Sequence, residues 1–366
     1  MIYLDYQATT PLAPEALDAM LPWLRDGYAN PHSAHAAGRK AKAAVEFARD
    51  QVAALLPSGG RVVFTSGATE ALNWAIKGTT GEMMTLATEH AAVLDTVHAE
   101  SRAGRNQTVL SVDRDGLVDL PMLRAATWPD TGVVAAMLVN NEIGVVQPIA
   151  EMAEVAHSVG ALLLCDAVQG YGRVPIPEGC DLIAISAHKI YGPKGIGALW
   201  IRDGVALEPL LHGGDQEGGR SGTLSPALCA GFGRAAAMMA ERREVDAAHI
   251  ERLWALATDR LGRGWHINGS TQYRYHGNLN IRRDGLDVAR LMSDLRDIAF
   301  SAGSACASGS GRSSHVLRAL GLSEAQARSS IRLGFGRYTT AAELTEAIDR
   351  IIAAADAQQI MGGIAA

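Results

Sequence analysis

The stretches Ala161-Leu-Leu-Leu-Cys-Asp166 and Asp181-Leu-Ile-Ala-Ile-Ser-Ala-His-Lys189 set the fold class of this chain. Each contains a short apolar run that ends in polar residues, a pattern typical of strands buried on both faces of a sheet. Four further runs of this kind are Arg61–Thr65, Met83–Ala87, Val133–Val139 and Ala198–Ile201. Helical patterns separate several of them, for example Glu70–Lys77 and Ile149–Val159. Buried strands that alternate with helices predict an α/β fold with a mostly parallel sheet.

The flanking sequence predicts a second, smaller unit. A chain of 366 residues is too long for one simple core, so two domains are expected. Outside the strand runs we expect helices at 14–25, 35–56, Ala227–Glu251, 253–262, Asp287–Leu295, 314–320 and from Ala341, and strands at Tyr275–Ile281 and Ser330–Leu333. We therefore predict a large cofactor-binding α/β domain at 13–250. Residues 1–12 and 251–366 would form a small α+β domain that carries a cysteine loop.

Composition excludes several classes of function. The 33 Lys and Arg against 39 Asp and Glu give a formal net charge of −6, which offers no general attraction to nucleic acid or to an anionic membrane. The N-terminus shows no secretory or transit pattern, and no apolar run is long enough for a bilayer, so we expect a cytoplasmic protein. The four cysteines are scattered, without a metal-binding spacing, which predicts neither a disulfide framework nor a metal site.

Two polar residues at strand ends suggest a cofactor. Ligands of such sheets bind at the carboxyl ends of the strands, where Asp166 and Lys189 lie one βα unit apart. Pyridoxal phosphate (PLP) requires this pair, because a lysine forms a Schiff base with its aldehyde and a carboxylate keeps its pyridine nitrogen protonated. The alternatives are a solvated turn lysine and an aspartate that accepts backbone hydrogen bonds. Lys194 is a competitor for the cofactor lysine, although its Gly-Pro-Lys-Gly setting better suits a loop.

Other residues gain meaning only in combination. Phe64-Thr-Ser-Gly-Ala-Thr-Glu-Ala71 is a strand end, a turn and a helix start, which serves either as a phosphate cradle or as a capped helix. His90 follows another strand and either stacks on a cofactor ring or is structural. Cys306 lies in a loop of tiny residues that offers little to bury a thiol against, which indicates a reactive cysteine. Arg332 either pairs with a substrate carboxylate or forms a surface salt bridge.

With these motifs in one order, the chain resembles the cysteine desulfurases of the NifS/IscS type, within the fold-type I PLP enzymes. The resemblance runs from Tyr3-Leu-Asp-Tyr-Gln-Ala-Thr-Thr-Pro to about residue 340. Matching stretches include Thr65-Ser-Gly-Ala-Thr-Glu, Thr88-Glu-His, Asp166-Ala-Val-Gln, Ser186-Ala-His-Lys-Ile-Tyr-Gly-Pro-Lys-Gly, Arg220-Ser-Gly-Thr and Gly303-Ser-Ala-Cys. Val168 stands where many relatives have a hydroxyl residue.

The resemblance implies a role for each matching residue. Lys189 would be the Schiff-base lysine, Asp166 the partner of the pyridine nitrogen, and His90 the ring-stacking imidazole. Because a free thiol is mostly protonated at neutral pH, the Cys306 proton must also be removed, and His90 is the candidate for this step. Further cofactor-binding residues would be Gln169 and Asn141 at the phenolic oxygen, Thr69, Ser186 and His188 at the phosphate, Ala68 beside them, and Thr223 from a second subunit. Arg332, with Asn141, would hold the substrate carboxylate. Cys306 would carry the sulfur as a persulfide.

The implied function is conversion of L-cysteine to L-alanine with transfer of sulfur to an acceptor protein. The implied assembly is a homodimer with shared active sites, and the implied pathways are iron–sulfur cluster assembly or the thiolation of tRNA or cofactors. Three alternatives stay open: a selenocysteine lyase or an aminotransferase on the same fold, and a non-catalytic sulfur-assembly partner. Only an enzyme that moves sulfur has a use for Cys306.

Overall fold

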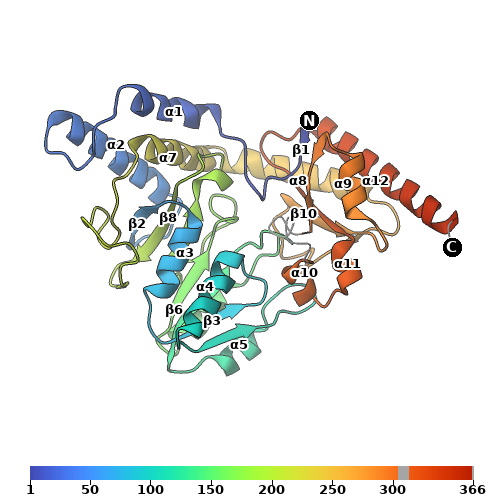
Figure 1. Cartoon of the computed structure of the whole chain (residues 1–366), viewed down its shortest axis with the longest axis horizontal. Coiled ribbons are helices and arrows are strands. Elements are labelled where there is room, and N and C mark those ends of the chain that lie inside the picture. The colour runs from blue at the N-terminus through green and yellow to red at the C-terminus, as the bar shows by residue number, and fades with distance from the viewer. Residues whose placement is uncertain (304–312, 365–366) are drawn as a thin grey trace.

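A seven-stranded sheet forms the centre of the larger lobe (Figure 1). The computed structural model describes residues 1–303 and 313–364. In order across the sheet the strands are β2 (Gly60–Thr65), β8 (Gly197–Arg202), β7 (Leu182–Ser186), β6 (Leu162–Asp166), β5 (Thr131–Met137), β3 (Glu82–Leu86) and β4 (Gln107–Leu110). All pairs are parallel except those of β8, which runs antiparallel to both neighbours. The predicted α/β fold with a mostly parallel sheet is confirmed.

Helices cover both faces of this sheet, which is why its central strands β5, β6 and β7 are almost entirely buried. The apolar side chains of one face pack with α1 (Pro14–Arg25), α2 (Ala36–Ala53), α5 (Leu120–Ala126), α6 (Ile149–His157) and α7 (Pro226–Glu241). Those of the other face pack with α3 (Ala68–Lys77) and α4 (Ala91–Arg102). The alternation is visible within one strand, because Val62 and Phe64 belong to the first cluster and Val63 to the second.

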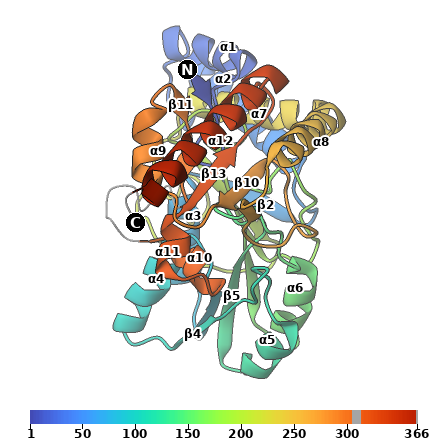
Figure 2. The ribbon, with the colours of Figure 1, turned by 90° about the vertical axis from the view of Figure 1, so that its right-hand side faces the viewer.

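A second sheet with its own apolar core forms the smaller lobe (Figure 2). Its antiparallel strands, in order, are β12 (Ser301–Ala302), β13 (Ser330–Gly334), β10 (Asn278–Arg282) and β9 (His266–Ile267). Around it lie α8 (Arg243–Arg260), α9 (Val288–Asp294), α10 (His315–Ala319), α11 (Glu324–Arg328) and α12 (Ala341–Ile364). Strand β1 (Ile2–Tyr3) pairs with β11 (Ile298–Ala299), so the N-terminus lies beside the C-terminal third of the chain. The domain boundaries at residues 12 and 250 stay a prediction.

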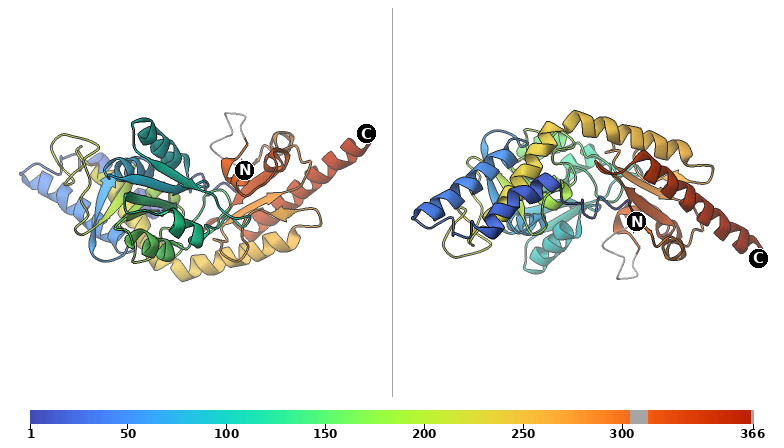
Figure 3. Two further views of the ribbon diagram at one scale, coloured as in Figure 1. Left: turned by 90° about the horizontal axis from the view of Figure 1, so that it is seen from below. Right: turned by 90° about the horizontal axis from the view of Figure 1, so that it is seen from above.

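The connection between the lobes differs from the sequence expectation. We expected one helix at Ala227–Glu251 and another at 253–262, whereas the break lies at Arg242, whose backbone leaves the helical region (φ −109°, ψ 4°). Helix α8 then runs along one flank of the molecule to the second sheet (Figure 3). The edge strand β4 was missed because its sequence Gln-Thr-Val-Leu is only partly buried and forms no apolar run.

The carboxyl ends of β3, β5, β6 and β7 meet at one edge of the large sheet, as parallel strands require. The amino end of the antiparallel β8 lies at the same edge, since Ser186 pairs with Gly197. No helix within residues 1–303 and 313–364 is long and apolar enough to cross a lipid bilayer.

Candidate active site

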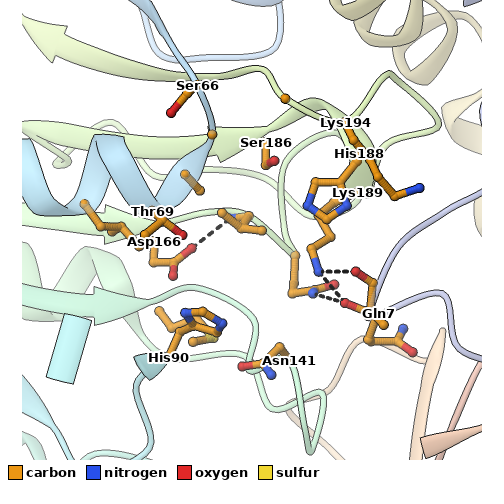
Figure 4. A pocket seen from close by; sticks show the side chains of 18 of the residues that line it. Gln7, Ser66, Thr69, His90, Asn141, Asp166, Ser186, His188, Lys189 and Lys194 are labelled. Carbon is orange, nitrogen blue, oxygen red and sulfur yellow. Dashed lines mark hydrogen bonds between the residues drawn. The ribbon is translucent and has the colours of Figure 1, made fainter. Parts of the chain in front are cut away.

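A cavity of about 450 Å³ lies at this edge, between the large sheet and β13 (Figure 4). The candidate residues that line it are Ala68, Thr69, His90, Asn141, Asp166, Gln169, Ser186, His188, Lys189 and Arg332. Two candidates are not among its lining residues. Thr223 is exposed on the segment between β8 and α7, and Cys306 lies outside the described residues.

Lys189 ends a single 3-10 turn (Ala187–Lys189) that follows β7 directly. Its Nζ donates hydrogen bonds to the backbone carbonyl oxygens of Gln7, at 2.6 Å, and Ala8, at 2.8 Å. Burial, together with the nearby positive charges of Arg332 and Arg173, lowers the pKa of this amine to about 8. A nucleophilic lysine must be neutral to attack an aldehyde, and this environment favours the neutral amine.

Asp166 is the last residue of β6, and its carboxylate is buried. Its Oδ1 accepts a hydrogen bond from the Val168 backbone N–H at 3.0 Å. Burial raises the pKa of this carboxyl, while His90, Val168 and Lys189 act in the opposite direction. A buried carboxylate of this kind gains most from a cation placed next to it, such as a protonated pyridine nitrogen.

His90 caps the N-terminus of α4, where its Nδ1 accepts a hydrogen bond from the Ala92 backbone N–H at 3.1 Å. Burial lowers the pKa of the imidazole, which favours the neutral ring. In a neutral ring whose Nδ1 accepts, the proton sits on Nε2. This tautomer suits an imidazole that stacks on a cofactor ring. It does not suit acceptance of the Cys306 proton, which would require the capping bond to break.

The N-terminus of α3 forms a further part of the cavity wall. Its N-cap is Gly67, and no side chain of the described residues caps this helix end. A Cβ built at Gly67 would meet nothing within 4 Å, so the backbone here borders open space. An uncapped first turn presents backbone N–H groups and the positive end of the helix dipole, the usual setting for a phosphate. Ser186 and His188 line the same cavity, and burial lowers the pKa of His188 to about 4, which keeps its ring neutral.

Arg332 reaches the cavity from β13, on the other sheet, and only 1% of it is exposed. Its Nη2 forms an ion pair with Asp5 at 2.7 Å, and its Nη1 donates to the Asn141 carbonyl oxygen at 3.0 Å. Its buried Nε has no hydrogen-bond partner among the described residues. A buried N–H without an acceptor is costly, and a substrate carboxylate in the cavity would satisfy it.

The sequence reasoning assigned no role to Gln7. Its carbonyl oxygen accepts from both Lys189 Nζ and Gln169 Nε2, the latter at 2.9 Å. The only signal for it was its place in the motif Tyr3-Leu-Asp-Tyr-Gln-Ala-Thr-Thr-Pro, which matched the family without indicating a function. Ser66, Gly67 and Lys194 also line the cavity.

The site has the three polar features that PLP needs, in one cavity. Lys189 would supply an amine for the aldehyde, Asp166 a carboxylate for the ring nitrogen, and the start of α3 a binding place for the phosphate. Figure 4 shows Thr69, Asp166 and Lys189 around one central space, with His90 on one side of it. These residues therefore fit the cofactor, and their individual roles stay predictions.

Comparison with known proteins places the chain in a family. The family model for aminotransferase class V matches residues 2–346. The chain belongs to this family. It is 45% identical to the mitochondrial cysteine desulfurase of Eremothecium gossypii, over 96% of this chain and 75% of that protein. It is 44% identical to cysteine desulfurase IscS of Anaeromyxobacter dehalogenans, over 95% of this chain and 90% of that protein.

Solved structures agree with the sequence comparison. The crystal structure of a NifS-like protein from Rickettsia africae superposes with a TM-score of 0.88 and 31% identity, over 97% of this chain and 99% of that one. The predicted resemblance and fold type are thereby confirmed. Class-V aminotransferases and cysteine desulfurases are PLP-dependent, so the predicted cofactor is confirmed as well.

Proposed function

We propose that this protein is a PLP-dependent cysteine desulfurase, which converts L-cysteine to L-alanine and transfers the sulfur through a persulfide on Cys306. The observation that carries the proposal is the meeting of Lys189, Asp166 and Arg332 in one cavity, in a chain whose relatives are cysteine desulfurases. An amine, a carboxylate and a buried guanidinium supply what an α-amino acid substrate and its cofactor require.

Each residue has a definite task in this reaction. PLP, when bound, withdraws electrons from the substrate Cα. Asp166 keeps the proton on the ring nitrogen, which maintains that electron demand. Lys189 Nζ takes the proton from Cα, for which its lowered pKa of about 8 is well suited. Arg332 binds the substrate carboxylate through Nε and thereby orients Cα toward the amine.

The sulfur step belongs to Cys306. Its thiolate attacks the sulfur of the bound substrate, so that an S–S bond forms while the substrate C–S bond breaks, and the substrate carbon leaves as alanine after protonation. The neighbours of segment 304–312 support this role. Ser301 Oγ accepts a hydrogen bond from Arg332 Nη2 at 3.2 Å, and His315 Nε2 contacts the Glu89 carbonyl oxygen at 2.9 Å. Ser301, which precedes the segment in the sequence, thus contacts a residue that lines the cavity, and His315, which follows it, contacts the residue before His90.

A homodimer with shared active sites is part of the proposal. Thr223 is exposed and is not among the residues that line the cavity of its own chain, as expected of a residue that serves a partner's site. Exposed apolar side chains on and between α1 and α2, among them Leu24, Tyr28 and Phe47, favour burial in an interface. The sulfur acceptor would be a carrier or scaffold protein, and the scattered cysteines agree with a reducing cytoplasm.

The test is the product spectrum of the PLP-loaded protein with L-cysteine and a thiol reductant. We expect sulfide and alanine in equal amounts. Formation of a 2-oxo acid instead would show an aminotransferase, and turnover of L-selenocysteine alone would show a selenocysteine lyase. No turnover of any of these by protein that binds PLP would support a non-catalytic partner.

A further inference from the structure

The loop Asp215–Gly222 contacts the larger lobe on both sides of the turn Ser66–Thr69, which borders the cavity. Its first contact is with β2, the strand that leads into this turn. Glu217 is buried, and its Oε2 accepts a hydrogen bond from the Phe64 backbone N–H at 2.9 Å. The same carboxylate forms an ion pair with Arg49 at 2.7 Å. Because Phe64 lies just before the end of β2, Glu217 fixes the loop to the strand that leads into the turn.

The same loop also contacts α3, the helix that begins within this turn. Arg220 Nε lies 2.8 Å from Glu70 Oε1, and Arg220 Nη2 donates to Glu70 Oε2 at 3.2 Å. Glu70 Oε2 in turn accepts the Ser66 backbone N–H at 2.7 Å. Gly222 permits this arrangement, because it has φ of +130° and an added Cβ would lie 2.8 Å from Arg220 Nη1. The chain Arg220, Glu70, Ser66 thus ends on a residue that lines the cavity.

The charges give the contact between Arg220 and Glu70 an electrostatic role in addition to its structural one. Glu70 lies in the first turn of α3 and directly follows the turn Ser66–Thr69 in the chain. The residues of that turn border the cavity. A carboxylate at that position repels an anion bound at the helix N-terminus unless a cation neutralises it. The side chains of Arg220 and Glu70 are only 13% and 11% exposed, so water screens this interaction little. Burial alone would raise the pKa of Glu70, but the hydrogen bonds from Arg220 and Ser66 outweigh it and lower this pKa, which keeps the carboxylate ionised.

We propose that Arg220 is a positioning residue for the phosphate end of the cofactor site: it neutralises Glu70 and, through Glu70, holds the turn Ser66–Thr69 in the form that binds an anionic phosphate. This inference rests on the proposed PLP-dependent function. It assigns Arg220 a task within its own chain.

The test compares PLP binding by four apo-proteins: wild type, R220Q, E70Q and the double variant R220Q/E70Q. PLP is titrated into each, the visible absorbance of the bound cofactor gives the dissociation constant, and the thermal unfolding of each apo-protein is measured in parallel. R220Q leaves the Glu70 carboxylate without its neutralising cation, and this charge then repels the cofactor phosphate. We therefore expect PLP to bind about tenfold more weakly. Removal of that charge should restore binding in R220Q/E70Q to within about threefold of wild type.

The matched control is R61Q. Arg61 donates to the backbone carbonyl oxygens of Glu217 and Gly218, at 3.0 and 2.8 Å, so its loss loosens the same loop without stranding a carboxylate. Any weakening of PLP binding in R61Q should therefore not be relieved by E70Q. Wild-type affinity in R220Q, or equal weakening in R220Q and R220Q/E70Q, would overturn the inference. A wild-type protein that binds no PLP would overturn the proposed function itself.

Discussion

The amine of Lys189 and the backbone carbonyl of Gln7, 182 positions apart in the chain, are joined by a hydrogen bond of 2.6 Å. The neighbouring Ala8 carbonyl accepts a second bond from the same nitrogen at 2.8 Å. A neutral amine has two N–H groups, and these two acceptors satisfy both of them. The N-terminal segment therefore forms a wall of the cavity around the lysine, whose neutral form is favoured by burial and by the charges of Arg332 and Arg173.

Single substitutions can decide which of the two lysines that line the cavity, Lys189 or Lys194, binds the cofactor. We expect Lys189→Ala to lose the visible absorbance of lysine-bound PLP and to lower desulfurase activity by about 10³-fold or more, because the substitution removes the amine that takes the Cα proton in the proposed reaction. Lys194→Ala is the matched control, since Lys194 lines the same cavity, and it should keep the absorbance band. A band that persists in Lys189→Ala would refute the assignment.

Asp166→Asn tests the charge of the carboxylate at nearly constant shape. The asparagine oxygen can still accept the Val168 N–H, so the fold and the PLP content should be preserved. The amide cannot hold a proton on the ring nitrogen, and we expect kcat to fall about 100-fold. Steady-state kinetics and the cofactor-to-protein ratio are the measurements. Unchanged kcat with full PLP content would show that the ring nitrogen needs no anionic partner here.

Arg332→Lys tests the recognition of the substrate carboxylate. Lysine keeps the positive charge for Asp5 but lacks the second, fork-shaped donor, so we expect KM for L-cysteine to rise about tenfold or more with a smaller effect on kcat. The PLP absorbance should not change. Should kcat fall while KM stays constant, Arg332 would serve the structure of the smaller lobe through its ion pair with Asp5 instead of the substrate.

Cys306→Ala tests the persulfide step. We expect wild-type protein treated with L-cysteine to gain the mass of one sulfur atom, and the variant to show neither this gain nor sulfide release, while its PLP absorbance stays normal. Cys229→Ala is the control, because Cys229 is buried in α7 and burial raises its thiol pKa to about 12, which makes it inert. Full sulfide release by Cys306→Ala would exclude the persulfide route.

The lowered pKa of Lys189 predicts two pH dependences of the apo-protein. PLP should attach faster as the pH rises through about 8, where the buried amine loses its proton. The unfolded chain retains this proton up to its ordinary pKa of 10.5, so between about 8 and 10.5 the unfolded state binds more protons. The free energy of unfolding should therefore contain a contribution that rises with pH over this range.

Lys189→Ala supplies the comparison for both measurements. The difference in stability between wild type and Lys189→Ala, from denaturant unfolding at several pH values, isolates the lysine contribution. A difference that falls with pH over this range would mean that the folded protein binds the amine proton more tightly than the unfolded chain does.

The fold class and the central residues of the cavity were predictable from local sequence. Apolar runs reveal buried strands, and parallel strands bring their carboxyl ends to one edge, so Asp166, Lys189 and His90 were expected together before any contact was known. The same reasoning misplaced the break between α7 and α8, because both sides of Arg242 have helical patterns and the turn depends on how the helices pack. For the exposed Thr223, the family resemblance remains the source of its predicted role at the cofactor phosphate of a second subunit.

The state of the site, in contrast, depends on contacts between distant segments. Asp5 pairs with Arg332 across 327 positions, and Arg220 reaches Glu70 across 150. Periodicity carries no information on such pairs, because their geometry follows from the docking of whole elements against one another. The lowered pKa of Lys189 and the tautomer of His90 likewise follow from burial and from single hydrogen bonds that exist only in the folded chain. Local sequence thus names the reactive groups, and long-range packing sets their charge and orientation.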